Sequence, residues 1–172
     1  MQKTAVDAAQ LVGWFAGRIP DDWFTGPPEI TADRDEILIV GELPEPEVPE
    51  GASAEAARAA RIEGFREETR SRRIRIALEA QGRFRRKVSW GATCGDVTRL
   101  FTVLSVPAMT RLRLEERSVL DTLVDAGVAR SRSEALAWCV RLVAKNQDEW
   151  LSDLRAAFTA VAKVRAEGPQ VF

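Results

Sequence analysis

Residues 106–145 read VPAMTRLRLEERSVLDTLVDAGVARSRSEALAWCVRLVAK, and the spacing of their apolar side chains changes along this stretch. Residues 109–114 alternate, with Thr110, Leu112 and Leu114 on one face. An alternation of period two is typical of a β-strand that buries one side. The stretch therefore opens with a predicted short strand, which begins soon after Pro107.

Two helices are predicted after this strand. Glu115 and Glu116 supply an acidic first turn, which suits a helix N-terminus, and Gly127 suits the end of that helix. Ser131 and Glu134 then form an S-x-x-E capping box that opens a second helix. One strand and two helices cannot bury all their apolar faces alone, so the pattern predicts a partner copy.

This arrangement resembles the ribbon-helix-helix superfamily of the MetJ, Arc and CopG repressors. The resemblance covers residues 106–145 and lies in the phrases TRLRL, LDTLVDAG and ARSRSEAL. It implies a homodimer whose two strands pair as a ribbon in the DNA major groove, where arginine forks can reach guanine edges. The DNA-binding residues that it implies are Met109, Arg111, Arg113, Ser131, Arg132 and Ser133.

Outward from this module, residues 44–53 read PEPEVPEGAS, a composition typical of an extended linker. Before it, a short helix and a hairpin of residues 29–31 with 36–42 form a small head. After the module, an added helix is predicted to begin near Asn146. The predicted organisation is an acidic α+β head (1–43), the Pro/Glu linker (44–53), a basic helix with a connecting segment (54–96), and the ribbon-helix-helix-like module with its C-terminal helix (97–172).

The charges are distributed unevenly. The 25 basic and 26 acidic side chains give a net charge of −1. That sum hides −9 in residues 1–57, +7 in residues 58–99 and +1 in the remainder. A helix over residues 54–81 with a long basic face is expected from its Ala, Arg and Glu content. Its basic side chains and those that follow it give a possible secondary surface for nucleic acid or an acidic partner: Arg72, Arg73, Arg75, Arg83, Arg85, Arg86 and Lys87.

After the basic helix, a strand is expected at residues 87–90. Asp96 is then expected to cap a helix with apolar residues at 97, 100, 101 and 104, although a strand there remains an alternative.

The composition argues against catalysis. The chain has no histidine, so a Ser-His-Asp or Cys-His pair is excluded. Cys94 and Cys139 are too far apart in sequence for a zinc knuckle and too few to complete a tetrahedral shell. We therefore expect a protein that is not an enzyme and that uses no cofactor and no metal.

The sequence predicts a mainly α protein with small β elements (α+β). Its expected function is that of a homodimeric bacterial DNA-binding protein, a transcriptional regulator or nucleoid-associated protein that reads double-stranded DNA with the paired ribbon. The alternative is a dimeric scaffold of the same fold that binds a protein or ribonucleoprotein partner without reading DNA. No apolar run is long enough for a membrane span, so a cytoplasmic protein is expected, located at the nucleoid if it binds DNA.

Overall fold

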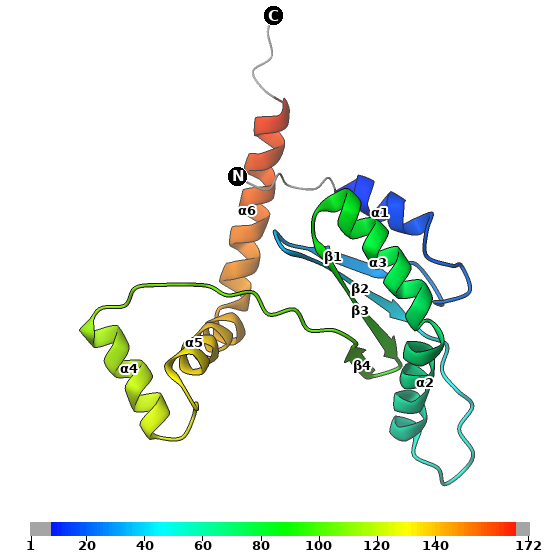
Figure 1. Cartoon of the computed structure of the whole chain (residues 1–172), viewed down its shortest axis with the longest axis horizontal. Coiled ribbons are helices and arrows are strands. Elements are labelled where there is room, and N and C mark those ends of the chain that lie inside the picture. Colours follow the sequence, from blue (N-terminus) through cyan, green and yellow to red (C-terminus); the bar gives the residue numbers. More distant parts are fainter. Residues whose placement is uncertain (1–7, 168–172) are drawn as a thin grey trace, which may run out of the picture. The chain divides into compact units, whose positions relative to one another are not determined.

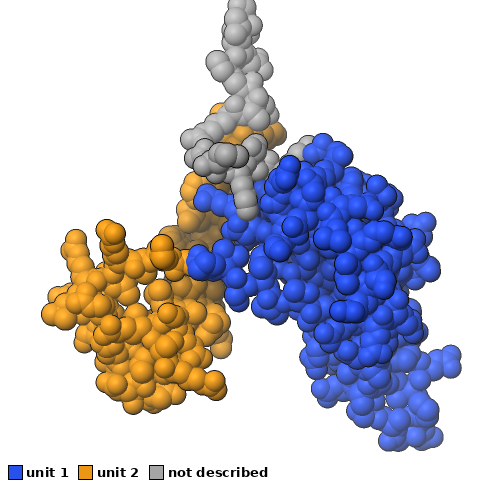
Figure 2. Space-filling model, in the orientation of Figure 1, with its two compact units in different colours: residues 1–107 blue, residues 108–172 orange. Residues whose placement is uncertain are grey.

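The computed structural model describes residues 8–167, which divide into two compact units (Figures 1 and 2). Unit 1 ends at Pro107, and unit 2 begins at Ala108. The ends of the predicted head and of the predicted C-terminal module, residues 1–7 and 168–172, lie outside the described residues.

Unit 1 is built on a four-stranded mixed sheet in the order β1-β2-β3-β4 (Figure 1). The strands are β1 (Glu29–Ala32), β2 (Glu36–Glu42), β3 (Lys87–Cys94) and β4 (Val97–Leu100). β1 pairs antiparallel with β2, which confirms the predicted hairpin. The hairpin does not belong to a separate head, however, because β2 also pairs with β3, in parallel, from Glu36 opposite Lys87 to Glu42 opposite Thr93.

Three helices supply the rest of unit 1, namely α1 (Ala8–Ala16), α2 (Ala54–Glu68) and α3 (Arg70–Phe84). The main core joins α1 and α3 to alternate residues of β2 and β3, with Phe15, Ile37, Ile39, Ile76 and Trp90 buried together. A second cluster joins Ile62 of α2 to the end of β3. Because strand side chains alternate in direction, these contacts place the three helices on one face of the sheet.

The expected single helix over residues 54–81 is divided into α2 and α3 at Thr69. The hydroxyl of Thr69 donates to the carbonyl of Phe65 at 2.6 Å and accepts from Arg73 Nε at 2.9 Å. Arg73 Nη2 also donates to the carbonyl of Arg66 at 2.6 Å. Side chains that bond to backbone carbonyls one turn back compete with the helical ladder, which accounts for the break.

Residues 97–100 form β4, so the helix expected after Asp96 is wrong and the alternative strand is right. β4 returns along β3 through Gly95, whose φ of +57° is a conformation that favours glycine. Arg58 ties this turn to the linker, because its guanidinium bonds Asp96 at 2.8 Å and Glu45 at 2.7 Å.

Unit 2 contains three helices and no strand among its described residues: α4 (Leu114–Asp125), α5 (Arg132–Asn146) and α6 (Asp148–Glu167). The predicted strand of residues 109–114 is wrong, and with it the ribbon-helix-helix module. Residues 101–113 are irregular. Instead of pairing with a strand, the N–H of Arg113 donates to the Glu116 carboxylate and the carbonyl of Leu112 accepts from Arg117. Local side-chain bonds thus occupy backbone groups that a ribbon would need.

The boundaries of α4 and α5 otherwise follow the sequence. Glu115 and Glu116 lie in the first turn of α4, and Gly127 follows that helix with φ +73°. Ser131 caps α5 by accepting from the N–H of Glu134 at 3.2 Å. No helix in the described range is long and apolar enough to cross a membrane.

Candidate nucleic-acid interface

The most strongly charged surface of unit 1 follows α3 and the residues just after it. Residues 70–87 contain eight basic side chains and one acidic side chain, Glu79. Glu79 Oε2 is paired with Arg18 at 3.2 Å. The single carboxylate in this stretch is therefore already matched by a cation from outside it.

α3 presents its arginines to solvent because a different side of the helix is apolar. Ile76, Ala80 and Phe84 recur at helical spacing and are buried against the sheet. At 100° per residue, Arg72, Arg75 and Arg83 fall within one sector of about 80° that borders the buried side, and all three are exposed. Their span along the axis is about 16 Å at 1.5 Å per residue.

Two more cations extend this surface beyond the end of α3. Arg85 ends the helix with a left-handed backbone, φ +58°, and Lys87 begins β3. Both side chains are exposed, and they line a hollow of about 410 Å³ together with Gln81, Asp35 and Leu104. We define the basic surface by its five exposed cations: Arg72, Arg75, Arg83, Arg85 and Lys87.

Within the part of the chain that the structure describes, these five cations form no ion pair with a carboxylate. The i, i+4 pair of Glu79 with Arg83, which the sequence allows, does not form, because Glu79 bonds Arg18 instead. Unpaired, solvated guanidinium groups in a row are the arrangement that contacts phosphate oxygens in nucleic acids.

Two of the seven basic residues predicted for this surface do not belong to it. Arg73 and Arg86 are both 6% exposed. Arg73 lies over the Phe101 ring at 4.6 Å, and burial with the neighbouring Arg66 and Arg70 charges lowers its pKa to about 10. Arg86 Nε donates to the carbonyl of Asp33 at 2.5 Å and fastens the β1–β2 turn to the end of α3.

The six residues predicted from the resemblance lie in unit 2. Met109, at 98% exposure, and the exposed Arg111 and Arg113 lie in the irregular segment before α4. Ser131, Arg132 and Ser133 are exposed at the start of α5. The Arg132 fork binds both oxygens of Asp121, at 2.6 and 2.7 Å, and this bond lowers the pKa of Asp121. Arg132 is thus engaged within its own unit.

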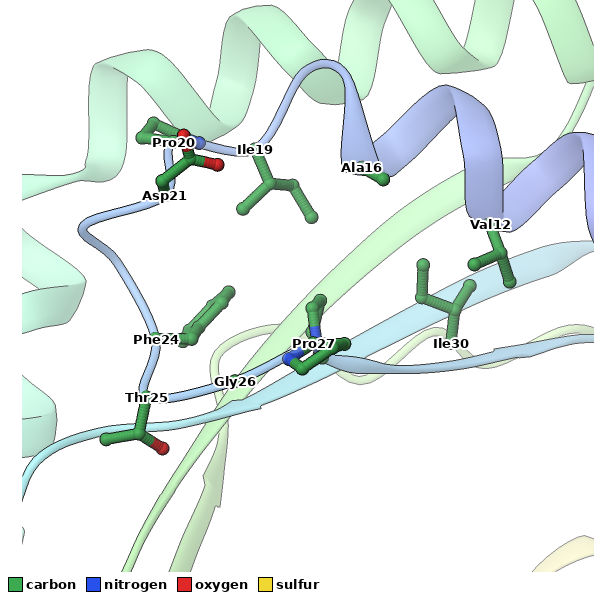
Figure 3. Close-up of a pocket in the computed structure, with 11 residues that line it drawn as sticks. Val12, Ala16, Ile19, Pro20, Asp21, Phe24, Thr25, Gly26, Pro27 and Ile30 are labelled. Carbon is green, nitrogen blue, oxygen red and sulfur yellow. The ribbon is translucent and has the colours of Figure 1, made fainter.

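An apolar pocket of about 310 Å³ lies between α1, the following loop and β1 (Figure 3). Val12, Ile19, Phe24 and Ile30 surround it. Its polar lining is small, and the Thr25 hydroxyl is already bonded to the carbonyl of Glu42. The described residues contain no group of His, Cys, Asp and Glu side chains suited to a metal ion.

Fold and surface together define an α+β protein in two units, with a basic helix face on the sheet-bearing unit and a helical second unit. The chain belongs to the Rv1265-like family. Residues 9–100 match the model of "Rv1265-like protein, N-terminal domain", and residues 113–165 match that of "Mb1296 C-terminal domain". Two findings therefore correct the ribbon-helix-helix assignment. Residues 109–113 form no strand, and the chain matches a different family.

Mycobacterial relatives match almost the whole chain. The uncharacterized protein Mb1296 of Mycobacterium bovis is 55% identical over 165 residues, which cover 96% of this chain and 73% of the relative. The uncharacterized protein Rv1265 of Mycobacterium tuberculosis matches to the same extent. No solved structure matches the chain.

Proposed function

We propose that this protein binds double-stranded DNA through the basic surface of α3, as a transcriptional regulator or a nucleoid-associated protein. The observation that carries the proposal is the row of five exposed cations without carboxylate partners in the described chain. Binding of this kind is dominated by phosphate contacts and the release of counterions. The net charge of −1 does not oppose it, because most of the acidic excess lies in residues 1–57.

The test is duplex binding measured by fluorescence anisotropy with a mixed-sequence fragment at low salt. The variant Arg72→Gln/Arg75→Gln/Arg83→Gln removes three charges from the basic surface and leaves the buried side of α3 intact. The matched control Arg34→Gln/Arg141→Gln/Arg155→Gln removes three exposed charges elsewhere. We expect at least a tenfold loss of affinity in the first variant and a much smaller loss in the control. Equal losses, or no binding by the wild type at low salt, would contradict the proposal.

Arg111 and Arg113 remain predicted DNA contacts, now as exposed residues of an irregular segment. Glu115 and Glu116 lie close to them in sequence, so the local charge is nearly balanced. We therefore expect Arg111→Gln/Arg113→Gln to lose less affinity in the same assay than the α3 variant. A larger loss would move the binding surface to this segment.

A protein partner is the second candidate, because α3 also exposes two apolar side chains. Ile74 is 47% exposed and Leu78 is 64% exposed, one turn apart and beside Arg75. An apolar ridge flanked by cations suits a partner segment with acidic and apolar residues. If DNA is the ligand, Ile74→Ser/Leu78→Ser should keep its duplex affinity. The partner hypothesis instead predicts that the wild type does not bind the duplex at all.

A further inference from the structure

Unit 2 has too small a core for its length. Among the described residues of unit 2, the buried core consists of Leu120, Ala129 and Ala135, and five side chains that are only partly buried pack against it: Leu112, Leu123, Val124, Leu136 and Cys139. Two of the three buried side chains are single methyl groups. A folded unit of this size ordinarily buries more than half of the surface that its unfolded chain exposes, so three residues, two of them alanine, are insufficient.

Much of the apolar surface that unit 2 leaves exposed lies on α6. This 20-residue helix contributes no buried side chain to the described structure. An isolated helix of this length is marginal in water, because most helical stability in proteins comes from packing of an apolar face. Leu151 is half-buried, but the other five of the six large apolar side chains of α6 are well exposed: Trp150 (58%), Leu154 (40%), Phe158 (66%), Val161 (48%) and Val164 (68%).

These side chains are spaced for helix–helix packing. Residues 150, 154, 157, 161 and 164 are separated by alternating steps of four and three, which is the a/d seam of a heptad repeat. Phe158 widens the seam on one side, as in helical bundles. With about 150–250 Å² for each aromatic side chain, Trp150 and Phe158 alone leave roughly 250 Å² of apolar surface in water. This heptad spacing indicates that the partner packed against the seam of α6 is another helix.

The seam and the charges of α6 fit a second α6 that runs in the opposite direction. The seam is symmetric about Ala157, so an antiparallel copy places Trp150 opposite Val164 and Leu154 beside Val161. Residues 148–157 of α6 carry a net charge of −2, from Asp148, Glu149 and Asp153 against Arg155, whereas residues 158–167 carry a net charge of +1. An antiparallel pair brings the acidic end of one helix to the basic end of the other and opposes their dipoles favourably.

α5 also exposes apolar side chains. Val140 and Val143 are 63% and 51% exposed, and they lie farther along α5 than Ala135, Leu136 and Cys139, which belong to the core with α4. Two copies of α5 and α6 can thus supply the four helices of a bundle. We propose that α6 is the dimerisation element of this protein, and that it packs antiparallel against α6 of a second copy of the chain around Ala157.

The mass of the full chain in solution tests the dimer. The variant Leu154→Glu/Val161→Glu charges the seam at two positions seven residues apart. The control Ser152→Glu/Thr159→Glu adds the same charges at the same spacing on the opposite side of α6. Light scattering after gel filtration should give twice 19.1 kDa for the wild type and the control. It should give 19.1 kDa for the seam variant at the same concentration. A monomeric wild type would overturn the proposal and would indicate that α6 packs on its own chain. A seam variant that is still dimeric would overturn it as well.

Cysteine crosslinking tests the orientation, in a Cys139→Ala background. Chains with Trp150→Cys mixed with chains with Val164→Cys should form a crosslinked heterodimer on mild oxidation. Each variant alone should give little crosslinked product. Crosslinking of the Trp150→Cys chain with itself would indicate a parallel pair and overturn the antiparallel arrangement. Neither result depends on whether the protein binds DNA.

Discussion

At the scale of single residues, Arg73 shows that an arginine of the basic helix α3 can serve the fold instead of the surface. Its guanidinium is buried without a carboxylate partner among the described residues, and it is held by Thr69, the carbonyl of Arg66 and the Phe101 ring. Its lowered pKa, about 10, reflects the cost of removing this cation from water. Arg73 therefore contributes to folding through its packing and its hydrogen bonds, and its charge opposes folding.

Substitution of Arg73 separates these two contributions. Arg73→Ala loses the packing on Phe101 and both hydrogen bonds, so we expect the free energy of unfolding to fall by about 2 kcal/mol. Arg73→Met keeps most of the packing and removes the desolvated charge, so we expect a change within about 1 kcal/mol. Urea unfolding of unit 1, followed by tryptophan fluorescence, measures both. Equal destabilisation by the two substitutions would contradict this role for Arg73.

The two cysteines differ in burial and should differ in reactivity. Cys94 is fully buried, and burial is the main cause that raises the pKa of its thiol, with Glu45 acting in the same direction. Cys139 is half-buried. Because the thiolate is the reactive form, iodoacetamide at neutral pH should alkylate Cys139 well before Cys94. Mass spectrometry of tryptic peptides over time measures the order, and faster alkylation of Cys94 would contradict the structure.

At the scale of elements, the sequence was informative where local chemistry decides the structure. The β1–β2 hairpin, the acidic start of α4, the Gly127 stop and the Ser131 cap all depend on neighbouring residues, and all were predicted. The strand predicted at residues 109–114 is wrong, because six alternating residues also fit an irregular segment whose backbone groups bond to the side chains of Glu116 and Arg117.

The features that depend on distant residues were missed. The parallel pairing of β2 with β3 joins segments about 50 residues apart, and no local pattern reports it. The same holds for Arg73 and Arg86, which the sequence places among exposed arginines. Their burial is decided by Phe101 for Arg73 and by the β1–β2 turn for Arg86. The other five of the seven basic residues that charge density indicated are exposed, and whether they bind a ligand stays a prediction.

Two glycines in unit 1 should respond in opposite directions to alanine. A Cβ on Gly41 of β2 would lie 2.2 Å from the Phe24 ring, so Gly41→Ala must displace that ring. We expect it to cost about 1–3 kcal/mol of unfolding free energy. Gly82 of α3 has open space around it, so Gly82→Ala should stabilise unit 1 by about 0.5–1 kcal/mol through helix propensity. Chemical denaturation of both variants measures the change in unfolding free energy relative to the wild type. Changes of the same sign in the two variants would contradict this prediction.

At the scale of the whole molecule, the described chain consists of two units (Figure 2), and an irregular segment joins β4 to α4 (Figure 1). Residues 105–111 are exposed and contain no helix or strand. Brief trypsin treatment should therefore cut first after Arg111 or Arg113, because helical and strand backbone must unfold locally before cleavage. Intact mass measurement of the fragments identifies the site. First cleavage within α2 or α3 would contradict the division into units.

The two proposed surfaces lie on different units of the chain. The basic surface lies on unit 1, and the apolar seam of α6 lies on unit 2. Loss of the dimer through the seam variant therefore leaves all five cations of each basic surface in place. It should weaken duplex binding only by removing the second copy from the complex.

The salt dependence of duplex binding tests the central claim most directly. Five phosphate contacts predict that log K falls with log salt concentration with a slope of about −4 to −5 for one basic surface. Removing Arg72, Arg75 and Arg83 together should make that slope shallower by about 2 to 3. The control substitutions at Arg34, Arg141 and Arg155 should leave the slope unchanged. Equal slopes for the wild type and the Arg72→Gln/Arg75→Gln/Arg83→Gln variant would contradict the assignment of the basic surface to DNA.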